Sequence, residues 1–197
     1  MPLSDYLTQI RSSCPKLTDK ETNLFAKGLE VQTLAPDDIF LRVGDVPQSV
    51  AYVSKGLIKA VYTDFEGNRV NVNFFREGTG VCDYQAFRER SGSRYDFVAI
   101  EPCTLILLPF THFEHCCNQV PQLERYYRIA LERVLFAYIR RTERFLITDA
   151  KTRYLDFIHA EPELFKRLSV SDLCSYLGIS RQTLTKIRKQ LLTKGDK

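Results

Sequence analysis

The chain has 197 residues, of which 44% are apolar and 26% are charged. This length suits one large or two small domains, and the composition excludes a disordered or membrane-embedded chain. The net charge of +4 is unevenly distributed: residues 148–197 hold ten basic and six acidic residues, whereas residues 1–147 are balanced. A neutral body joined to a basic end is typical of a sensor joined to a DNA-binding domain.

Residues 1–15 lack the apolar core of a signal peptide, and no apolar run reaches the ~20 residues that span a bilayer. We therefore expect a cytoplasmic chain without membrane contact. The six cysteines form no C-x-x-C pair and are predicted to be reduced thiols. His112, His115 and Cys116 could share a helix face and bind a metal, but no second ligand group accompanies them. Without a nucleophile–base pair or paired carboxylates, no catalytic residue, no metal site and no enzyme activity are predicted.

Residues 3–27 are predicted to be helical, with a Thr18-x-x-Glu21 capping box inside the segment and Gly28 at its end. From residue 31 to residue 109, short β-branched and aromatic runs alternate with turns, which indicates a small antiparallel barrel or sandwich. Between two of these runs, Gly67 and Asn68 are expected to supply positive φ angles in a hairpin turn. The predicted strands are 31–34, 38–42, 49–54, 57–62, 69–75, 95–100 and 104–108.

Residues 110–121 are predicted to form a short helix that Pro121 ends. The following segment, 122–147, contains no proline or glycine and predicts a helix about 39 Å long. Its apolar stripe is explained if the helix pairs with its own copy, although it could instead pack wholly against its own β domain. The predicted dimer-helix residues are Tyr127, Leu131, Val134, Leu135, Tyr138 and Phe145.

The last part of the chain predicts two short helices joined by a tight turn. Ser169 and Asp172 form a Ser-x-x-acid capping box, Gly178 ends the first helix, and Ser180 can cap the second. Leu184, Ile187 and Leu191 then recur at spacings of three and four, so they share one buried face. The pattern indicates a helix-turn-helix whose second helix enters the DNA major groove, or an ordinary αα-hairpin with a solvated polar face.

Two features favour DNA binding over the ordinary hairpin. Residues 180–197 hold six basic residues and one acidic residue, and the second helix begins with Arg181 and Gln182. Arg and Gln side chains pair bidentately with guanine and adenine edges, so these two are expected to contact bases, and Lys186 a base or a phosphate. The full set predicted to bind DNA, largely through phosphates, is Ser169, Ser171, Ser180, Arg181, Gln182, Thr183, Thr185, Lys186, Arg188 and Lys189.

The run Leu-Gly-Ile-Ser-Arg-Gln-Thr-Leu-Thr-Lys-Ile-Arg-Lys (177–189) resembles the recognition helix of the Crp/Fnr family of bacterial transcription regulators. Residues 41–45 and 52–59 also resemble the β-roll of that family. The resemblance implies an α+β fold with an antiparallel, jelly-roll-like β-roll and flanking helices (1–121), a dimerisation helix (122–147) and a helix-turn-helix domain (148–197). It further implies a homodimer that binds a palindromic double-stranded DNA site and has RNA polymerase as a possible partner. The family's two-stranded wing is expected to be absent or truncated here.

The sequence departs from the family at the cyclic-nucleotide cassette. Nucleotide-binding relatives use a Gly-Glu-Leu turn and an Arg-Ser or Arg-Thr pair, because a phosphate needs N–H groups and an arginine, and a ribose needs a carboxylate. Here Val81 follows Gly80, and only Arg94 keeps its place. The candidate pocket residues are Asp83, Tyr84, Arg94 and Tyr95.

No cofactor is predicted, and we expect no response to cyclic AMP; the effector is unknown. An alternative function remains open at this stage. The protein would then be a small-molecule-binding β-roll whose helix-turn-helix contacts another protein.

Overall fold

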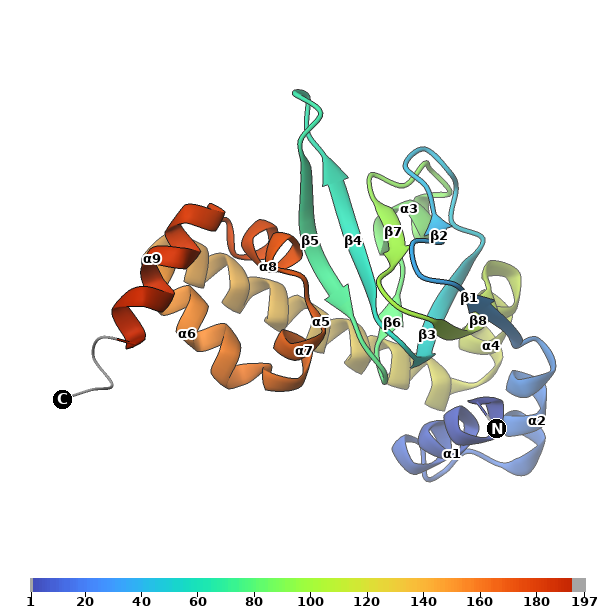
Figure 1. Ribbon diagram of the computed structural model, residues 1–197. Coiled ribbons are helices and arrows are strands. Elements are labelled where there is room, and N and C mark those ends of the chain that lie inside the picture. The colour runs from blue at the N-terminus through green and yellow to red at the C-terminus, as the bar shows by residue number, and fades with distance from the viewer. Residues whose placement is uncertain (1, 193–197) are drawn as a thin grey trace. The chain divides into compact units, whose positions relative to one another are not determined.

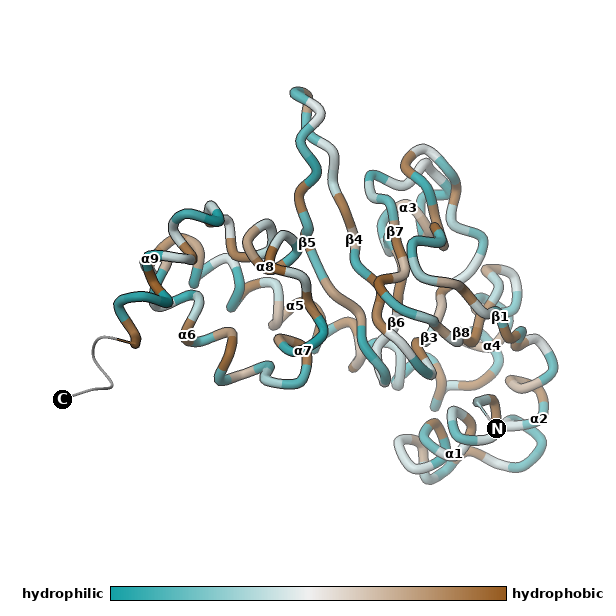
Figure 2. The backbone as a smooth tube through the Cα atoms, viewed as in Figure 1, coloured by the Kyte–Doolittle hydropathy of each residue, from teal (hydrophilic) through white to brown (hydrophobic). Residues whose placement is uncertain are grey.

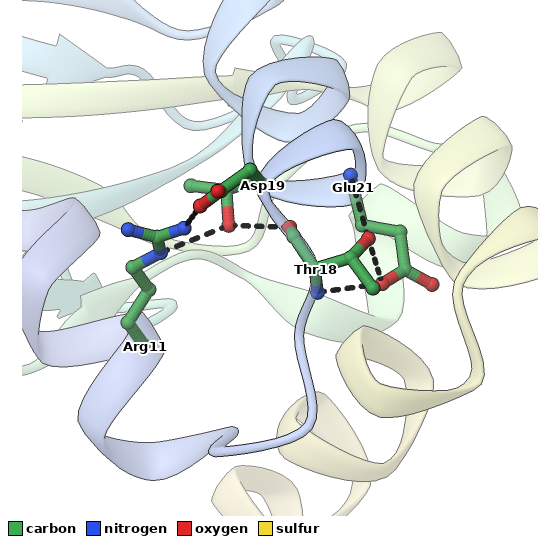
Figure 3. Close-up of polar contacts among 5 residues, drawn as sticks. Arg11, Thr18, Asp19 and Glu21 are labelled. Atoms are coloured by element: carbon green, nitrogen blue, oxygen red, sulfur yellow. Dashed lines mark hydrogen bonds and ion pairs between the residues drawn. The ribbon is translucent and has the colours of Figure 1, made fainter.

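The computed structural model describes residues 2–192. The chain begins with two helices, α1 (Pro2–Ser13) and α2 (Asp19–Lys27). The predicted capping box at α2 is confirmed: the Thr18 hydroxyl accepts the Glu21 N–H, and the Glu21 carboxylate accepts the Thr18 N–H. Arg11 on α1 donates hydrogen bonds to Asp19 and to the Thr22 hydroxyl, so the two helices are tied together beside the cap (Figure 3).

The β domain consists of two four-stranded sheets, as Figure 1 shows. The first sheet has the order β1-β8-β3-β6 and the second β2-β7-β4-β5, and the recorded pairs are antiparallel. The strands are β1 (Glu30–Leu34), β2 (Ile39–Leu41), β3 (Ser49–Lys55), β4 (Ile58–Thr63), β5 (Arg69–Phe75), β6 (Gly80–Val81), β7 (Asp96–Ala99) and β8 (Cys103–Pro109). All seven predicted strands are present, and the antiparallel sandwich and the α+β fold are confirmed.

Two details differ from the sequence-based expectation. The short strand β6 was not predicted, because two residues carry no recognisable alternation of side chains. Gly67 has a positive φ of 83°, but Asn68 does not. The Asn68 side chain donates to the Asp64 carboxylate instead, so Gly67 supplies the positive φ and Asn68 stabilises the turn through its side chain. The expectation for Asn68 was therefore wrong.

The core of the β domain forms where helices pack on β8. Ile106 and Leu108 on this strand contact buried side chains from α1, α2, α3 (Tyr84–Glu89), α4 (Phe110–Gln119) and the start of α5 (Pro121–Ile147). Phe25, Phe87 and Leu123 are fully buried in this cluster. At about 25 cal/mol per Å² of apolar surface, such burial is the main force that holds the helices on the sheet.

Four helices follow α4 and α5 in chain order: α6 (Ala150–Ala160), α7 (Pro162–Arg167), α8 (Val170–Leu177) and α9 (Arg181–Leu192). The described residues form two compact units. The sensor unit comprises residues 2–62 and 73–133, and the reading unit comprises residues 63–72 and 134–192. The long helix and the strand β5 each contribute residues to both units. Within residues 2–192, no helix is long and apolar enough to cross a membrane.

All six cysteines are free thiols, four of them buried and two half-buried. Burial raises the pKa of the Cys82 and Cys117 thiols to about 12. On α4, the Cys116 Sγ lies 3.4 Å from His112 Nε2, which is also 2.9 Å from the carbonyl oxygen of Phe25. No group of three or more potential metal ligands gathers in the part of the chain that the structure describes.

The α2 cap generates a prediction for stability. Thr18→Ala removes the hydroxyl that accepts the Glu21 N–H, so we expect the free energy of unfolding to fall by about 1 kcal/mol. Urea denaturation followed by circular dichroism measures this change. Thr8→Ala, which removes an exposed hydroxyl inside α1, is the control; an equal loss in both variants would contradict a capping role for Thr18.

Candidate nucleic-acid interface and sensor cassette

Helix α8 begins at a side-chain cap. Ser169 has an extended backbone, and its hydroxyl oxygen accepts the Asp172 N–H at 3.0 Å. The Asp172 carboxylate, which the sequence predicted to complete a capping box, accepts hydrogen bonds from the Ser169 hydroxyl and from the Asn71 side chain. Ser169 and Ser171 are exposed at this end of the helix, where backbone N–H groups attract anions.

The turn between α8 and α9 depends on Gly178. This residue has left-handed angles (φ 63°, ψ 42°), and its N–H is directed to the carbonyls of Cys174 and Ser175. A Cβ atom here would lie 3.0 Å from the Phe145 ring, so a side chain at this position would require the ring to shift slightly. Ser180 then accepts the Thr183 N–H at 3.0 Å and begins α9, as predicted.

Helix α9 has one buried face and one polar face. Leu184 and Ile187 are buried against a small core that includes Leu173 and Leu177 of α8. Successive helix residues are rotated by about 100°, so the opposite face carries the remaining side chains. Figure 2 shows that hydrophilic residues predominate along this helix. The exposed residues on α9 include Arg181, Gln182, Thr185, Lys186, Arg188 and Lys189, whereas Thr183 is half-buried.

Arg188 differs from its neighbours in the predicted set. Its Nε lies 3.3 Å from the Tyr154 hydroxyl on α6, and its guanidinium carbon is 5.9 Å from the centre of that ring. The helical rotation explains this contact, because Arg188 follows the buried Ile187 by one position and Leu184 by four. In the free protein the Arg188 guanidinium therefore packs against α6, while the other basic residues extend along the polar face.

Two arginines that were not predicted to have this role hold the carbonyl end of α8. Arg141 on α5 donates to the Tyr176 carbonyl at 3.2 Å, and its guanidinium carbon lies 4.0 Å from the centre of the Tyr176 ring. Arg153 on α6 donates to the Leu177 carbonyl at 3.2 Å. Both guanidinium groups also lie over the Phe145 ring. Cations at the C-terminal end of a helix interact favourably with its carbonyl groups, so the two arginines fix α8.

A second unpredicted contact joins α8 to β5. Asn71 is 5% exposed, and its side-chain nitrogen donates to the Asp172 carboxylate at 2.8 Å. The Asn71 backbone N–H donates to the Ser175 hydroxyl at 2.8 Å. Asp172 and Ser175 are three positions apart and therefore share one face of α8. The sequence signal that could have drawn attention to this contact is a polar residue, Asn71, between two apolar neighbours within a predicted strand.

The second half of α5 exposes a continuous apolar surface in the reading unit. Val134, Leu135, Phe136, Tyr138, Ile139, Phe145, Leu146 and Ile147 are 39–80% exposed. This set includes four of the six predicted dimer-helix residues, and Leu131 is half-buried. Tyr127 does not belong with them. Its ring packs edge-on against Phe113 at 5.0 Å and its hydroxyl lies 3.4 Å from that of Tyr6, so it belongs to the core of its own sensor unit.

The predicted pocket residues surround the start of α3 in the sensor unit. Asp83 is buried; one carboxylate oxygen accepts the Ala86 N–H, and the other accepts the Ser93 hydroxyl and the Arg94 N–H. The Arg94 side chain is exposed, and its guanidinium donates to the Gln85 side-chain oxygen at 3.4 Å.

The two pocket tyrosines lie among aromatic rings. Tyr95 lies beneath the Arg94 guanidinium and packs edge-on against Tyr62 and Phe97. Tyr84 is half-buried against Phe87, and burial raises the pKa of its hydroxyl. Unlike these rings, the Asp83 carboxylate accepts hydrogen bonds from its own helix and from residues 93–94, and these bonds hold the local backbone in place.

Sequence comparison assigns both parts of the chain to known domain types. Residues 31–120 match the cyclic nucleotide-binding domain, and residues 147–195 match the MarR family, whose last matched positions lie outside the described residues. A cyclic nucleotide-binding domain followed by a helix-turn-helix decides the architecture. The chain therefore joins a cyclic nucleotide-binding domain to a MarR-family domain. No curated protein matches the chain by sequence.

Several solved structures share the fold of this chain at low sequence identity. The c-di-GMP-responsive global regulator CLP of Xanthomonas campestris has a TM-score of 0.73 at 16% identity, covering 90% of this chain and 93% of its own. FixK2 of Bradyrhizobium japonicum has a TM-score of 0.71 at 18% identity, with coverages of 85% and 86%. A protein of Eubacterium rectale described as a Crp/Fnr-family transcriptional regulator has a TM-score of 0.71 at 13% identity, with coverages of 92% and 86%.

The Gly178 turn generates a prediction for the stability of the reading unit. Gly178→Ala forces a left-handed alanine and brings its Cβ against Phe145, so we expect the reading unit to lose about 1–2 kcal/mol of stability. Thermal unfolding measures the loss. In a Phe145→Ala background the steric part disappears, and only the conformational part should remain. An unchanged melting temperature for Gly178→Ala would contradict the strain at this turn.

Proposed function

We propose that the protein is a sequence-specific, DNA-binding transcription regulator that acts as a homodimer. The observation that carries the proposal is the polar face of α9. Arg181, Gln182, Lys186 and Lys189 are exposed together on a helix whose other face is buried by Leu184 and Ile187. A recognition helix requires this arrangement, because base-reading side chains extend into the groove only if the opposite face is anchored.

The chemistry of the exposed side chains supports a division of labour. Arg181 and Gln182 lie in the first turn, where recognition helices contact base edges, and their side chains match guanine and adenine. Lys186 and Lys189 follow at spacings that keep them on the same face. Together with Ser169 and Ser171 at the start of α8 and with Ser180, they are proposed to hold phosphates.

Selection from a pool of random duplexes at two salt concentrations tests this function. We expect an enriched motif with two-fold symmetry and half-sites one helical turn apart. Binding that enriches no motif and disappears at moderate salt would indicate only a charged surface. If the purified protein retains a small molecule but does not bind DNA, the result would instead support a small-molecule-binding β-roll whose helix-turn-helix contacts another protein.

Arg181→Ala separates sequence reading from charge attraction. We expect it to lower the preference for the selected motif over a mismatched duplex by about 1–3 kcal/mol while leaving salt-dependent binding to other DNA. Lys189→Ala serves as the comparison, because loss of a phosphate contact should weaken binding to all sequences alike. Fluorescence anisotropy with both duplexes at two salt concentrations measures these effects. If Arg181→Ala retains full preference, the assigned role is wrong.

The proposed dimer uses the exposed apolar surface on α5. Its residues lie along the part of the helix adjoining α6 to α9, and pairing of two such helices would bury them in the manner of a coiled coil. A two-fold dimer would also present two copies of α9 to the same side of one duplex, which a palindromic site requires. RNA polymerase is proposed as a further partner on functional grounds alone.

Leu135→Glu tests the dimer. Leu135 is 56% exposed at the centre of the apolar surface, and a carboxylate there would be buried without a partner. We expect the dimer dissociation constant to rise by about 100-fold. Sedimentation velocity over a concentration series measures it. Lys20→Glu introduces the same carboxylate at an exposed position on α2, outside this helix, and is the control; a Leu135→Glu variant that remains dimeric would exclude this interface.

We also propose that cyclic AMP is not the effector. Asp83 supports this view, since both of its carboxylate oxygens accept hydrogen bonds from the protein and it caps α3. A ribose hydroxyl would have to displace these bonds. The exposed Arg94 lies against Gln85 and Tyr95, and its positive charge is suited to binding an anionic ligand. A screen of anionic small molecules would identify such an effector.

A further inference from the structure

Three elements of the reading unit meet at one point, which we call the joint. It consists of Asn71 and Val72 on β5, Arg141 on α5, and Asp172, Ser175 and Tyr176 on α8. Arg141 donates to the carbonyl groups of both Val72 and Tyr176. Asn71 donates to the Asp172 carboxylate and to the Ser175 hydroxyl. The first helix of the helix-turn-helix is therefore bonded to a strand and to the long helix at once.

The joint lies on the side of α8 that the core of the reading unit does not use. Leu173, Cys174 and Leu177 are buried inward. Asp172 and Ser175 bind β5 instead, and the Asn71 side chain that reaches them is 5% exposed. A charged hydrogen bond from a side chain in such a shielded position is stronger than one in water, and breaking it leaves the nearly buried Asn71 amide without this acceptor.

We infer that Asn71 is a positioning residue for DNA recognition, which sets the orientation of α8 and α9 relative to the dimer helix and thereby the half-site spacing that the dimer accepts. This inference rests on the proposed function. Between Ile147 at the end of α5 and Ala150 at the start of α6, the chain has only two residues outside helices, Thr148 and Asp149. The joint is a second attachment between α5 and the helices that follow it, because Arg141 and Asn71 both form hydrogen bonds to α8.

The physical reason is the entropic cost of binding with loosely held parts. Each α9 reads one half-site, and two half-sites are bound together only if the two helices are held at a fixed separation and rotation. A helix-turn-helix held by the joint has already lost this freedom before DNA arrives, so less binding free energy is spent on ordering it. Loosening the joint should therefore affect the reading of paired half-sites and leave each half-site contact unchanged.

A charge exchange across the hydrogen bond tests the role of Asn71. Asn71→Asp places a second carboxylate next to Asp172, and Asp172→Asn in the same chain restores a donor and an acceptor in reversed positions. We expect Asn71→Asp to weaken binding to the two-half-site duplex by about tenfold, the order of one charged hydrogen bond. It should also reduce the penalty for inserting one base pair between half-sites, which rotates them by about 35°. The double variant should recover both properties.

Controls distinguish positioning from general damage. A duplex with one half-site should bind wild type and Asn71→Asp equally. Asn73→Ala, which changes the same type of side chain two residues along β5 in the sensor unit, should leave spacing preference unchanged. Equal weakening on one and two half-sites, unchanged spacing preference, or tighter binding by Asn71→Asp would each overturn the inference, as would a folded double variant without recovery.

A second measurement does not require DNA. Hydrogen exchange of the α8 amides in the free protein should become faster in Asn71→Asp and return towards wild type in the double variant. Identical exchange in all three proteins would overturn the joint itself. If the three proteins show this pattern of exchange but the wild-type protein selects no DNA motif, the proposed function is wrong and the joint is still supported.

Discussion

The carbonyl end of α8 is held by two guanidinium groups, and the direction in which α9 leaves the turn depends on them. Arg141 and Arg153 neutralise the partial negative charge of this helix end and lie over the Phe145 ring. Gly178 follows at a place where a Cβ would lie only 3.0 Å from that ring. The two arginines, the Phe145 ring and Gly178 restrict one another, so α9 starts in a defined direction. The buried side chains of Leu184 and Ile187 then determine which face of α9 is polar and exposed.

Patterns that span a few residues were predictable from the sequence. The caps at Thr18, Ser169 and Ser180, the turn at Gly178 and the alternating strands depend on neighbours at most four positions away. The long helix was predictable for the same reason, since an uninterrupted helix needs only the absence of breakers and a sustained apolar stripe. The fold class and the helix-turn-helix followed from the order of these local elements.

Contacts between distant parts of the chain were not predictable. Asn71 and Asp172 are 101 positions apart, and nothing in the chemistry of either residue specifies the other. Arg141 holds the carbonyl groups of Val72 and Tyr176, which lie 69 and 35 positions away in the chain. Tyr127 was placed in the dimer stripe because its heptad position fits; the tertiary contacts with Phe113 and Tyr6 prevail over that periodicity. Periodicity identifies an apolar face and leaves open what covers it.

Burial changes the chemistry of two of the cysteines, Cys82 and Cys117. At neutral pH a thiol with a pKa of about 12, as at Cys82 and Cys117, carries a thiolate in only about one molecule in 100,000. Such a side chain behaves as a small apolar group that fills space. Its replacement by alanine or valine would change the volume at the site and little of the chemistry. At either position the side chain therefore contributes volume and apolar surface, and nucleophilic thiol chemistry at neutral pH is suppressed.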